Sequence, residues 1–434
     1  MKKFLALILA LVMALSLVAC GGNSGAQGEG DGDAATGSVY YLNFKPEAEE
    51  AWQALAKTYT DQTGVPVKVV TAASGEYETM LVSEMDKDGA PTLFQCNEGG
   101  VATWGDFCYD LSDSAVYNEL ASKDYALKNA DGEVISIAYC LETYGIIVNK
   151  ALLEQAGHSL DEITDFDSLK AVADDIHARA DELGFDAFTS AGLDGSSSWR
   201  FSGHLSNMPL FYEFRDDGIS SKPATIKGTY LDNYQKVWDL YITDSATTGA
   251  ALLTATGDQA EAEFGEGKAV FYQNGTWEYS NLTEKFGMNP DDLTMIPIYC
   301  GVEGEEKAGL CTGTENYWSV NKNAKEEDIK ATLDFLYWVV TSEEGTTMMA
   351  EQFGACPFNS SKAPSNPFSA LANEYVANGC YPVTWAFNYT PAVNDWRAAV
   401  VDALSKYTAG NGSWDDVKTA FVEGWATQYA NENA

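Results

Sequence analysis

Short continuous apolar runs alternate along the chain with stretches whose apolar residues recur at helical spacing. The first part of this pattern predicts three buried strands, at residues 38–44, 65–70 and 91–96. Helices connect them, because Pro46 suits a first helical turn and Gly64 suits a helix end. Strand, helix, strand, helix, strand is the order of a parallel sheet with right-handed crossovers.

The same alternation continues through the rest of the chain. It predicts strands at residues 134–138, 143–148, 269–273, 293–299 and 317–320. Amphipathic helices are predicted over 167–183, 229–241 and 326–340, and the region after Ala370 is mainly helical. Ser413 is expected to cap the last helix. Since neither an internal repeat nor a long linker interrupts the alternation, the sequence predicts two α/β lobes joined by several short crossings.

The N-terminal segment has the pattern of an export signal. Two lysines precede an apolar run over residues 4–18, which is too short for a comfortable membrane span and predicts a signal peptide over residues 1–19. Cys20 follows the small residue Ala19, so this segment resembles the bacterial lipobox, in which the first mature residue carries a lipid. Residues 20–37, the cysteine and a glycine-rich stretch, predict a lipidated flexible tether. We therefore expect an extracytoplasmic protein anchored to the cell membrane; an ordinary signal peptide with an incidental cysteine is the alternative.

Charge narrows the range of partners. The formal net charge of −38 argues against nucleic-acid binding and against adhesion to anionic lipid, and it suits neutral or cationic ligands. No C-x-x-C motif occurs and the chain has only three histidines, so no metal site and no cofactor are expected.

Seven cysteines remain besides Cys20. The sequence leaves open whether Cys300–Cys311 and Cys356–Cys380 form disulfides or all seven are free thiols.

Three segments, in this order along the chain, match motifs of one family. The first is the predicted strand and turn over residues 139–150, which ends in Asn149-Lys150 and leads to Ala156-Gly157. The second runs from Phe264-Gly265-Glu266-Gly267-Lys268-Ala269 to Gly275-Thr276-Trp277. The third joins Asn321-Lys322-Asn323, through a helix, to Ser342-Glu343-Glu344-Gly345. These segments resemble the family 1 extracellular solute-binding proteins of ABC importers, a group that includes maltodextrin-binding proteins; Val148 departs from the family's usual tyrosine.

The resemblance implies a fold and a function. The fold would be the α/β two-lobed, periplasmic-binding-protein-like (type II) fold, with a ligand cleft between the lobes and three hinge crossings. The N-lobe would comprise residues 38–140 and 300–341, and the C-lobe residues 143–298 and 350–434. The protein would be a monomer that captures a carbohydrate, such as an oligosaccharide, closes around it, and delivers it to the permease subunits of an importer.

The predicted binding residues follow strand ends, where ligands of α/β folds bind, and combine planar polar groups with flat rings that suit sugars. Gln95, Asn97 and Glu98 form a polar cluster after the third strand. The resemblance adds Asn43, Lys45, Glu76, Tyr77, Glu142, Trp277 and Glu278. Trp199 and Arg200 offer a stacking ring and a forked donor, and Asn316, Tyr317, Trp385 and Asn388 lie in loops that suit a cleft wall. Each has a structural alternative: a helix-terminus charge for Glu76, an ion pair for Glu142, and core packing for the aromatic residues.

Two other functions remain open from the sequence. The same fold could bind a polyamine or another non-sugar solute, which the acidic composition would suit. A lipid-anchored glycoside hydrolase would also use carboxylates and tryptophans, but no recognisable pair of catalytic carboxylates and no nucleophile motif occurs. We therefore expect a binding protein rather than an enzyme.

Overall fold

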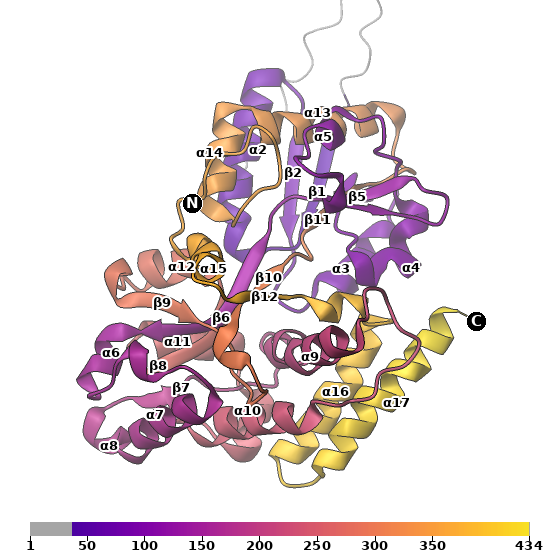
Figure 1. Cartoon of the computed structure of the whole chain (residues 1–434). Helices are drawn as coiled ribbons and strands as arrows, with labels where there is room; N and C mark the ends of the chain where they lie inside the picture. Colours follow the sequence, from indigo (N-terminus) through magenta and orange to yellow (C-terminus); the bar gives the residue numbers. More distant parts are fainter. Residues whose placement is uncertain (1–36, 434) are drawn as a thin grey trace, which may run out of the picture. The chain divides into compact units, whose positions relative to one another are not determined.

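The computed structural model describes residues 37–433, which lie in one compact unit, Thr36–Ala434. This unit contains two sheets with helices packed around each of them (Figure 1). The predicted signal peptide, Cys20 and all of the predicted tether before Gly37 lie outside the described residues. Within residues 37–433, no helix combines the length and the apolar composition needed to cross a membrane.

The first sheet has the parallel start that the sequence predicts. Its order is β2 (Val67–Thr71), β1 (Val39–Asn43), β3 (Leu93–Phe94), β11 (Tyr317–Val320), β5 (Val134–Ala138) and β4 (Ala126–Lys128). β1 is parallel to both β2 and β3, which confirms the predicted strand-helix-strand topology. β11 enters between β3 and β5 and is antiparallel to both, so a strand from late in the chain completes the sheet.

The second sheet is built around the long buried strand β6 (Glu142–Asn149). Its order is β12 (Tyr381–Thr384), β10 (Ala308–Gly313), β6, β8 (Ala269–Gly275) and β7 (Asp186–Phe188), and β9 (Leu293–Ile296) also pairs with β6. The chain passes between the two sheets after β5, after β10, and once more after α14, which gives three crossings.

The helices cover the two sheets. The first sheet carries α2 (Glu49–Thr63), α3 (Tyr77–Met85), α13 (Glu326–Thr341) and α14 (Glu343–Gln352). The helices of the second lobe include α6 (Lys150–Gln155), α7 (Phe166–Ala178), α9 (Asn207–Asp217), α10 (Leu231–Thr243), α11 (Gly257–Gly265), α15 (Phe368–Ala377), α16 (Val393–Thr408) and α17 (Trp414–Glu432). α16 and α17 lie side by side at the yellow end of the chain (Figure 1).

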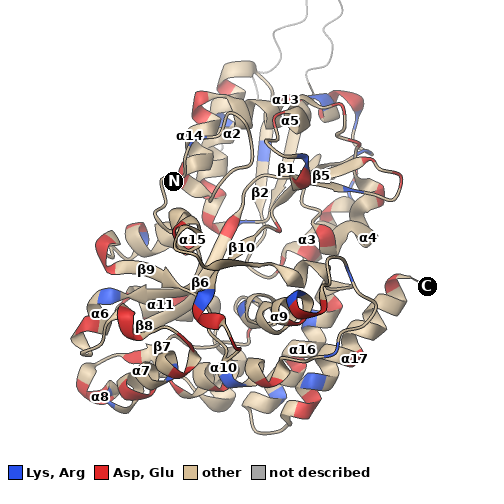
Figure 2. Ribbon diagram, in the orientation of Figure 1, with Lys and Arg blue, Asp and Glu red and all other residues tan. Residues whose placement is uncertain are grey.

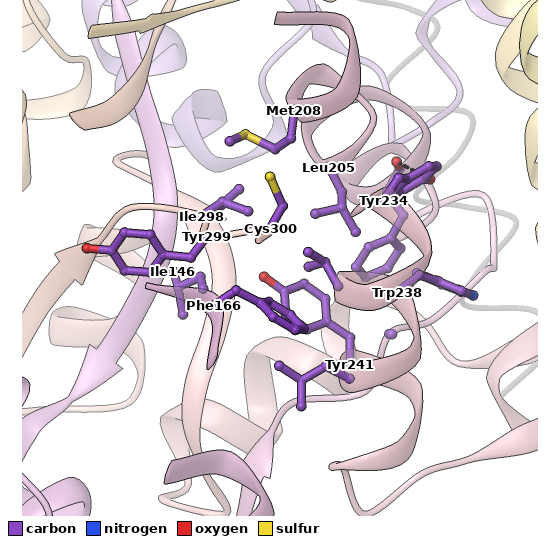
Figure 3. Close-up of a cluster of buried hydrophobic side chains, with 14 of the residues drawn as sticks. Ile146, Phe166, Leu205, Met208, Tyr234, Trp238, Tyr241, Ile298, Tyr299 and Cys300 are labelled. Atoms are coloured by element: carbon purple, nitrogen blue, oxygen red, sulfur yellow. Dashed lines mark hydrogen bonds between the residues drawn. The ribbon is translucent and has the colours of Figure 1, made fainter. Parts of the chain in front are cut away.

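Each lobe has its own hydrophobic core. In the second lobe, Trp238 and Tyr241 of α10 pack with Leu205, Ile298 and Cys300 in one buried cluster (Figure 3). In the first lobe, Trp52 of α2 packs against Tyr41 and Trp318 at ring-centroid distances of 5.1 and 6.0 Å. Such large buried aromatic surfaces stabilise each lobe independently.

Two of the expected lobe boundaries differ from the sheet pairing. The resemblance implies that residues 300–341 belong to the N-lobe, but β10 pairs with β6 and β12, and its apolar side chains pack in the core clusters of the second lobe. It also implies that the C-lobe resumes at residue 350, yet Phe353 and Phe358 pack in the first-lobe core. Neither lobe assignment could be predicted from the sequence, because the apolar pattern of a strand or loop does not show which sheet it joins.

All seven cysteines within the described residues are free thiols, and most of them are buried. The open question of Cys300–Cys311 and Cys356–Cys380 is therefore answered for this structure: neither disulfide is present among residues 37–433. Cys300 and Cys311 instead lie in the same apolar cluster, where each behaves as a small hydrophobic side chain.

Candidate ligand-binding cleft

A cavity of about 660 Å³ lies between residues of the two lobes. Its volume falls in the range of roughly 300–1,000 Å³ that is typical of small-molecule sites. One wall comes from the first lobe, around Lys45, Tyr77 and Gln95, and the other from the second lobe, around Trp277 and Arg397. Glu142 and Glu315, which lie at the crossings between the sheets, line it as well.

The first-lobe wall forms where parallel strands end. Lys45 follows β1, Tyr77 begins α3 after β2, and Gln95 and Asn97 follow β3. Because the carboxyl ends of neighbouring parallel strands meet at one edge of a sheet, these side chains converge on the cavity. Asn43, at the end of β1, shapes this edge: its side chain accepts from the Lys45 amide at 3.1 Å and donates to the Lys45 carbonyl at 2.7 Å.

A buried ion cluster lies at the crossing between the lobes. The Lys45 ammonium donates to Glu142 at 2.8 Å and lies 2.9 Å from a Glu47 oxygen. The Asn316 amide donates to the second Glu142 oxygen at 2.6 Å. Burial by itself lowers the pKa of Lys45, but the Glu142 and Glu47 carboxylates outweigh it and raise that pKa above its usual value. Lys45 therefore stays charged and fixes the positions of both carboxylates.

Aromatic rings form the second-lobe wall. His204 lies among three tryptophans, with ring centroids 5.0 Å from Trp199, 5.3 Å from Trp277 and 5.8 Å from Trp385. It also stacks on Tyr144 at 4.0 Å. Burial, together with nearby positive charges, lowers the pKa of His204 well below its usual value, so the ring is neutral at ordinary pH. The wall thus offers flat, uncharged faces.

Two glycines allow the tryptophans to lie close to the backbone. A Cβ atom on Gly275 would come within 2.3 Å of the Trp277 ring, and one on Gly313 within 2.5 Å of the Trp385 ring. Such distances are far shorter than van der Waals contact, so any larger residue would displace the ring. Gly275 ends β8 and Gly313 ends β10, and the second sheet therefore positions both rings directly.

Several polar atoms of the cavity lining have no partner within the described residues. They are Gln95 Oε1, His204 Nδ1, Trp385 Nε1 and Arg397 Nε. Gln95, His204 and Trp385 are almost fully buried, and a buried polar atom without a hydrogen bond is costly. A ligand or water that donates to Gln95 and accepts from Trp385 and Arg397 would remove this cost.

The family of the chain follows from its sequence over most of its length. A model of the family described as bacterial extracellular solute-binding protein matches residues 54–375. The chain belongs to this family. Members of this family are extracellular binding proteins and not enzymes. The alternative of a glycoside hydrolase is therefore set aside.

Solved structures of other binding proteins share the fold. The SBP RafE in complex with raffinose has a TM-score of 0.69 at 17% identity, covering 88% of this chain and 98% of that one. A chitin oligosaccharide binding protein has a TM-score of 0.70 at 15% identity, covering 91% and 100%. The GacH receptor of Streptomyces glaucescens, solved unliganded and with acarbose, has a TM-score of 0.65 at 18% identity, covering 91% and 99%. The two-lobed α/β fold expected from the resemblance is therefore confirmed.

In this solute-binding protein, part of the predicted set of binding residues lines the cavity. These residues are Lys45, Tyr77, Gln95, Asn97, Glu142, Trp199, Trp277 and Trp385. They come from both lobes and from a crossing, so the structure brings together residues that are more than 300 positions apart in the sequence.

Other predicted residues support the cavity from behind. Asn316 holds Glu142, as described above. Tyr317 donates to Glu98 at 2.9 Å, and burial raises the pKa of that carboxyl to about 7. Asn388 donates to the Thr314 carbonyl at 2.9 Å and fixes the loop that carries Trp385. Asn316, Tyr317, Glu98 and Asn388 are not among the residues that line the cavity.

Three predicted residues lie away from the cavity lining. Arg200 is buried in the second lobe, where it donates to Ser197 at 2.8 Å and to the Ser190 carbonyl at 3.0 Å. Glu278 accepts from Asn274 at 2.9 Å, and burial raises its pKa to about 8. Glu76 is exposed at the start of α3, which matches the helix-terminus alternative.

The sequence missed several lining residues. Glu47 and Glu78 are acids in the first turns after β1 and β2, a position that resembles a helix-terminus charge. His204 lies in a π-helical turn over residues 200–205, for which the sequence offered no periodic signal. Arg397 lies on α16, and its place in the sequence is typical of the polar face of an amphipathic helix. Packing alone brings it to the cleft.

No group of three or more histidine, cysteine or acidic side chains is arranged to hold a metal ion in the part of the chain that the structure describes. The polar groups of the cleft include amides, carboxylates, hydroxyl groups and two cations, of which Lys45 is already paired with carboxylates. The cleft of this solute-binding protein is therefore equipped for recognition by hydrogen bonds and aromatic faces.

Proposed function

We propose that the protein is the substrate-binding lipoprotein of an ABC importer, and that it captures a carbohydrate in this cleft and delivers it to the permease. The observation that carries the proposal is the combination of tryptophan faces with unpartnered hydrogen-bonding atoms in a single cavity. Sugars present C–H faces and hydroxyl edges, and this lining complements both kinds of surface.

The similar structures favour the same class of ligand. One of them was solved with raffinose, another is a chitin oligosaccharide binding protein, and the third was solved with acarbose; each of these ligands contains several rings. In this chain Trp199, Trp277 and Trp385 would stack on the apolar faces, while Gln95 and Glu142 would receive hydroxyl groups. The three tryptophan rings lie around His204, with centroids within 5.8 Å of it, and together they offer more stacking surface than a single sugar ring would use.

Capture would proceed by closure of the cleft. The lining comes from both lobes and the lobes are joined by three crossings, so a ligand that contacts both walls stabilises the closed arrangement. Lys45, Glu142 and Asn316 link the first lobe to two crossings before ligand arrives, which reduces the ordering cost of binding. The permease subunits would then recognise the closed monomer.

The lipid anchor belongs to the same proposal. The apolar run before Cys20 and the small residue Ala19 suit processing at that cysteine. Two or more acyl chains on Cys20 would hold the protein stably at the membrane surface, whereas a single chain would not. The glycine-rich residues that follow would leave the lobes free to reach the permease.

A second candidate ligand is a polyamine or another cationic solute. It is favoured by the acidic side chains of the lining, which outnumber Lys45 and Arg397. A polyamine, however, has no C–H face wide enough to use three tryptophans, and its charges would compete with Lys45 for Glu47 and Glu142.

A thermal-shift and calorimetry screen of the mature protein tests the proposal. The panel contains neutral oligosaccharides of different linkage and length, together with spermidine and putrescine. Binding of a sugar stabilises the folded state by about 2.7 kcal/mol at a hundredfold excess over Kd, and the melting temperature rises accordingly. Stabilisation by an amine without any response to sugars would contradict the proposal, as would turnover of a bound oligosaccharide.

A further inference from the structure

The charges of the cavity point to a ligand class that is narrower than sugars in general, and this inference rests on the proposed function. The acidic side chains that line the cavity are Glu47, Glu78, Glu142, Glu315 and Asp402, against the two cations Lys45 and Arg397. We propose that the cleft takes sugars without acidic groups, and that Glu47 and Glu78 accept hydrogen bonds from hydroxyl or ammonium groups of the ligand.

The two cations of the lining lie beside carboxylates. Lys45 lies 2.8 Å from Glu142 and 2.9 Å from Glu47, and only 6% of its side chain is exposed. Arg397 lies 3.8 Å from Glu315, which offsets its charge but leaves Arg397 Nε without a partner in the described part of the chain. A carboxylate, sulfate or phosphate on a ligand would therefore meet Arg397 alone, and the Glu315 carboxylate beside it would oppose binding of the anion, so little of the lost hydration would be replaced.

The first-lobe wall is rich in hydrogen-bond acceptors. Glu47 and Glu142 share the single ammonium of Lys45, so this cluster holds one carboxylate in excess. Glu78 accepts only the Trp104 indole N–H, at 3.1 Å, among the bonds of the described residues. Gln95 adds a buried amide oxygen with no partner in that part of the chain. Hydroxyl and ammonium groups donate to such acceptors, whereas an anionic group cannot.

The unpartnered donors lie on the opposite wall. Trp385 Nε1 and Arg397 Nε belong to the second lobe and are free to donate. A sugar hydroxyl can donate toward the first lobe and accept from the second, so a neutral polyol satisfies both walls at once. An amine-bearing sugar also fits, with its ammonium directed at Glu47 or Glu78, because hydrogen bonds to a charged partner are stronger than neutral ones.

The charge of the whole chain acts in the same direction. Acidic residues are spread over many helices and loops, with fewer basic residues among them (Figure 2). At a formal net charge of −38, long-range repulsion slows the approach of an anionic sugar and leaves a neutral one unaffected. This contribution weakens with added salt, whereas the acceptor wall of the cleft continues to discriminate.

A glycan array that spans neutral, amine-bearing and carboxylated or sulfated oligosaccharides tests the inference on the mature protein. Neutral or amine-bearing glycans should bind, and their uronate or sulfate counterparts of the same linkage should bind at least tenfold more weakly. If an acidic glycan binds as tightly as its neutral counterpart, the charge inference fails while the sugar-binding function stands. If no glycan binds, the proposed function fails and the inference fails with it.

Two substitutions locate the selectivity. Glu78→Gln and Glu47→Gln keep the side-chain shape and remove a charge. Their matched controls are Glu76→Gln and Glu49→Gln, which change exposed acids close to each of them in the sequence. The probes are a glucosamine trisaccharide and its N-acetylated form. Loss of the carboxylate should reduce binding of the amine relative to the acetylated sugar by roughly fivefold, with no change in the controls. Equal ratios in all four variants, with unchanged melting temperatures, would overturn the role of these acids.

Discussion

At the scale of the residue, the cleft depends on side chains that are held by their neighbours before any ligand is present. Lys45 is fixed by Glu142 and Glu47, and Glu142 is in turn fixed by Asn316. Trp277 lies against Gly275, and the Lys45 ammonium is 5.6 Å from the Trp277 ring. The aromatic wall and the ion cluster are therefore neighbours in the cleft. The contribution of each to binding or stability can be tested by one substitution.

Trp277→Ala should weaken binding of the sugar ligand at least tenfold while unfolding remains cooperative. The ring is only partly buried, so its loss removes a stacking face rather than a core side chain, and a stacking contact of roughly 1.4 kcal/mol corresponds to a factor of ten. Calorimetric titration with the sugar that the ligand screen identifies measures the effect. Trp277→Phe keeps a flat ring and should retain most of the affinity, and Tyr337→Ala, at an exposed aromatic residue of α13, should change nothing. Unchanged affinity in Trp277→Ala would count against the stacking role.

Lys45→Met should lower the free energy of unfolding by about 3–5 kcal/mol, because it leaves two carboxylates near the crossing without their buried partner. Urea denaturation measures the loss. Lys57→Met, at an exposed lysine that pairs with Asp61, should change stability by about 0.5 kcal/mol or less. The double variant with Glu142→Gln should recover part of the loss. A cost no greater than that of Lys57→Met would mean that the buried cluster is not needed for stability.

At the scale of the element, local chemistry decides where helices begin and end, and these points could be predicted from the sequence. Pro46 starts the helical segment that becomes α2, and Gly64 ends that helix in the left-handed conformation, with φ of 78°. Ser413 caps α17 through the Asp416 amide, as its sequence predicts. By contrast, the π-helical turn at 200–205 and the short strand β10 could not be predicted, because their backbone follows tertiary contacts rather than local preference.

Gly64→Ala should destabilise the protein by about 1–2 kcal/mol. The cause is conformational, since no atom lies within 4 Å of the position that the new Cβ would occupy, but a positive φ is unfavourable for any residue with a side chain. Equilibrium unfolding in urea measures the change. Gly89→Ala is the matched control: it also meets no atom within 4 Å, and its φ lies outside the left-handed region. If both substitutions cost the same, the left-handed helix end does not explain the result.

At the scale of the whole molecule, the two-lobed fold could be predicted, and half of the predicted binding residues line the candidate cleft. Lys45, Tyr77 and Gln95 follow strands whose parallel order was readable from the sequence, so their convergence follows from topology. His204 and Arg397 could not be found in this way, because their helices reach the cavity only through packing of the second lobe. The membership of β10 in the second sheet was hidden for the same reason.

Some carboxyl groups of this acidic chain lie in the interior, and their titration makes the stability of the fold depend on pH. Glu278 is almost fully buried in the second lobe, and one of its oxygens has no partner within the described residues. Burial, with smaller contributions from Glu261 and Glu47, raises the pKa of Glu278 from 4.5 to about 8. Between these two values the folded protein holds a proton that the unfolded chain has released, so this group stabilises the fold at low pH and its contribution falls as the pH rises.

Glu278→Gln isolates this contribution, because the amide mimics the protonated carboxyl and can still accept from Asn274. Below about pH 4 the two proteins should be equally stable, and by about pH 9 the variant should be the more stable by roughly 2–4 kcal/mol. Urea denaturation across this range measures the difference, in which the titration of all other groups cancels. Glu133→Gln, at an exposed acid of the first lobe, serves as the control and should follow the parent at every pH. Parallel curves for the parent and Glu278→Gln would show that Glu278 titrates near its ordinary value, and the buried proton would then have to be abandoned as the source of the pH dependence.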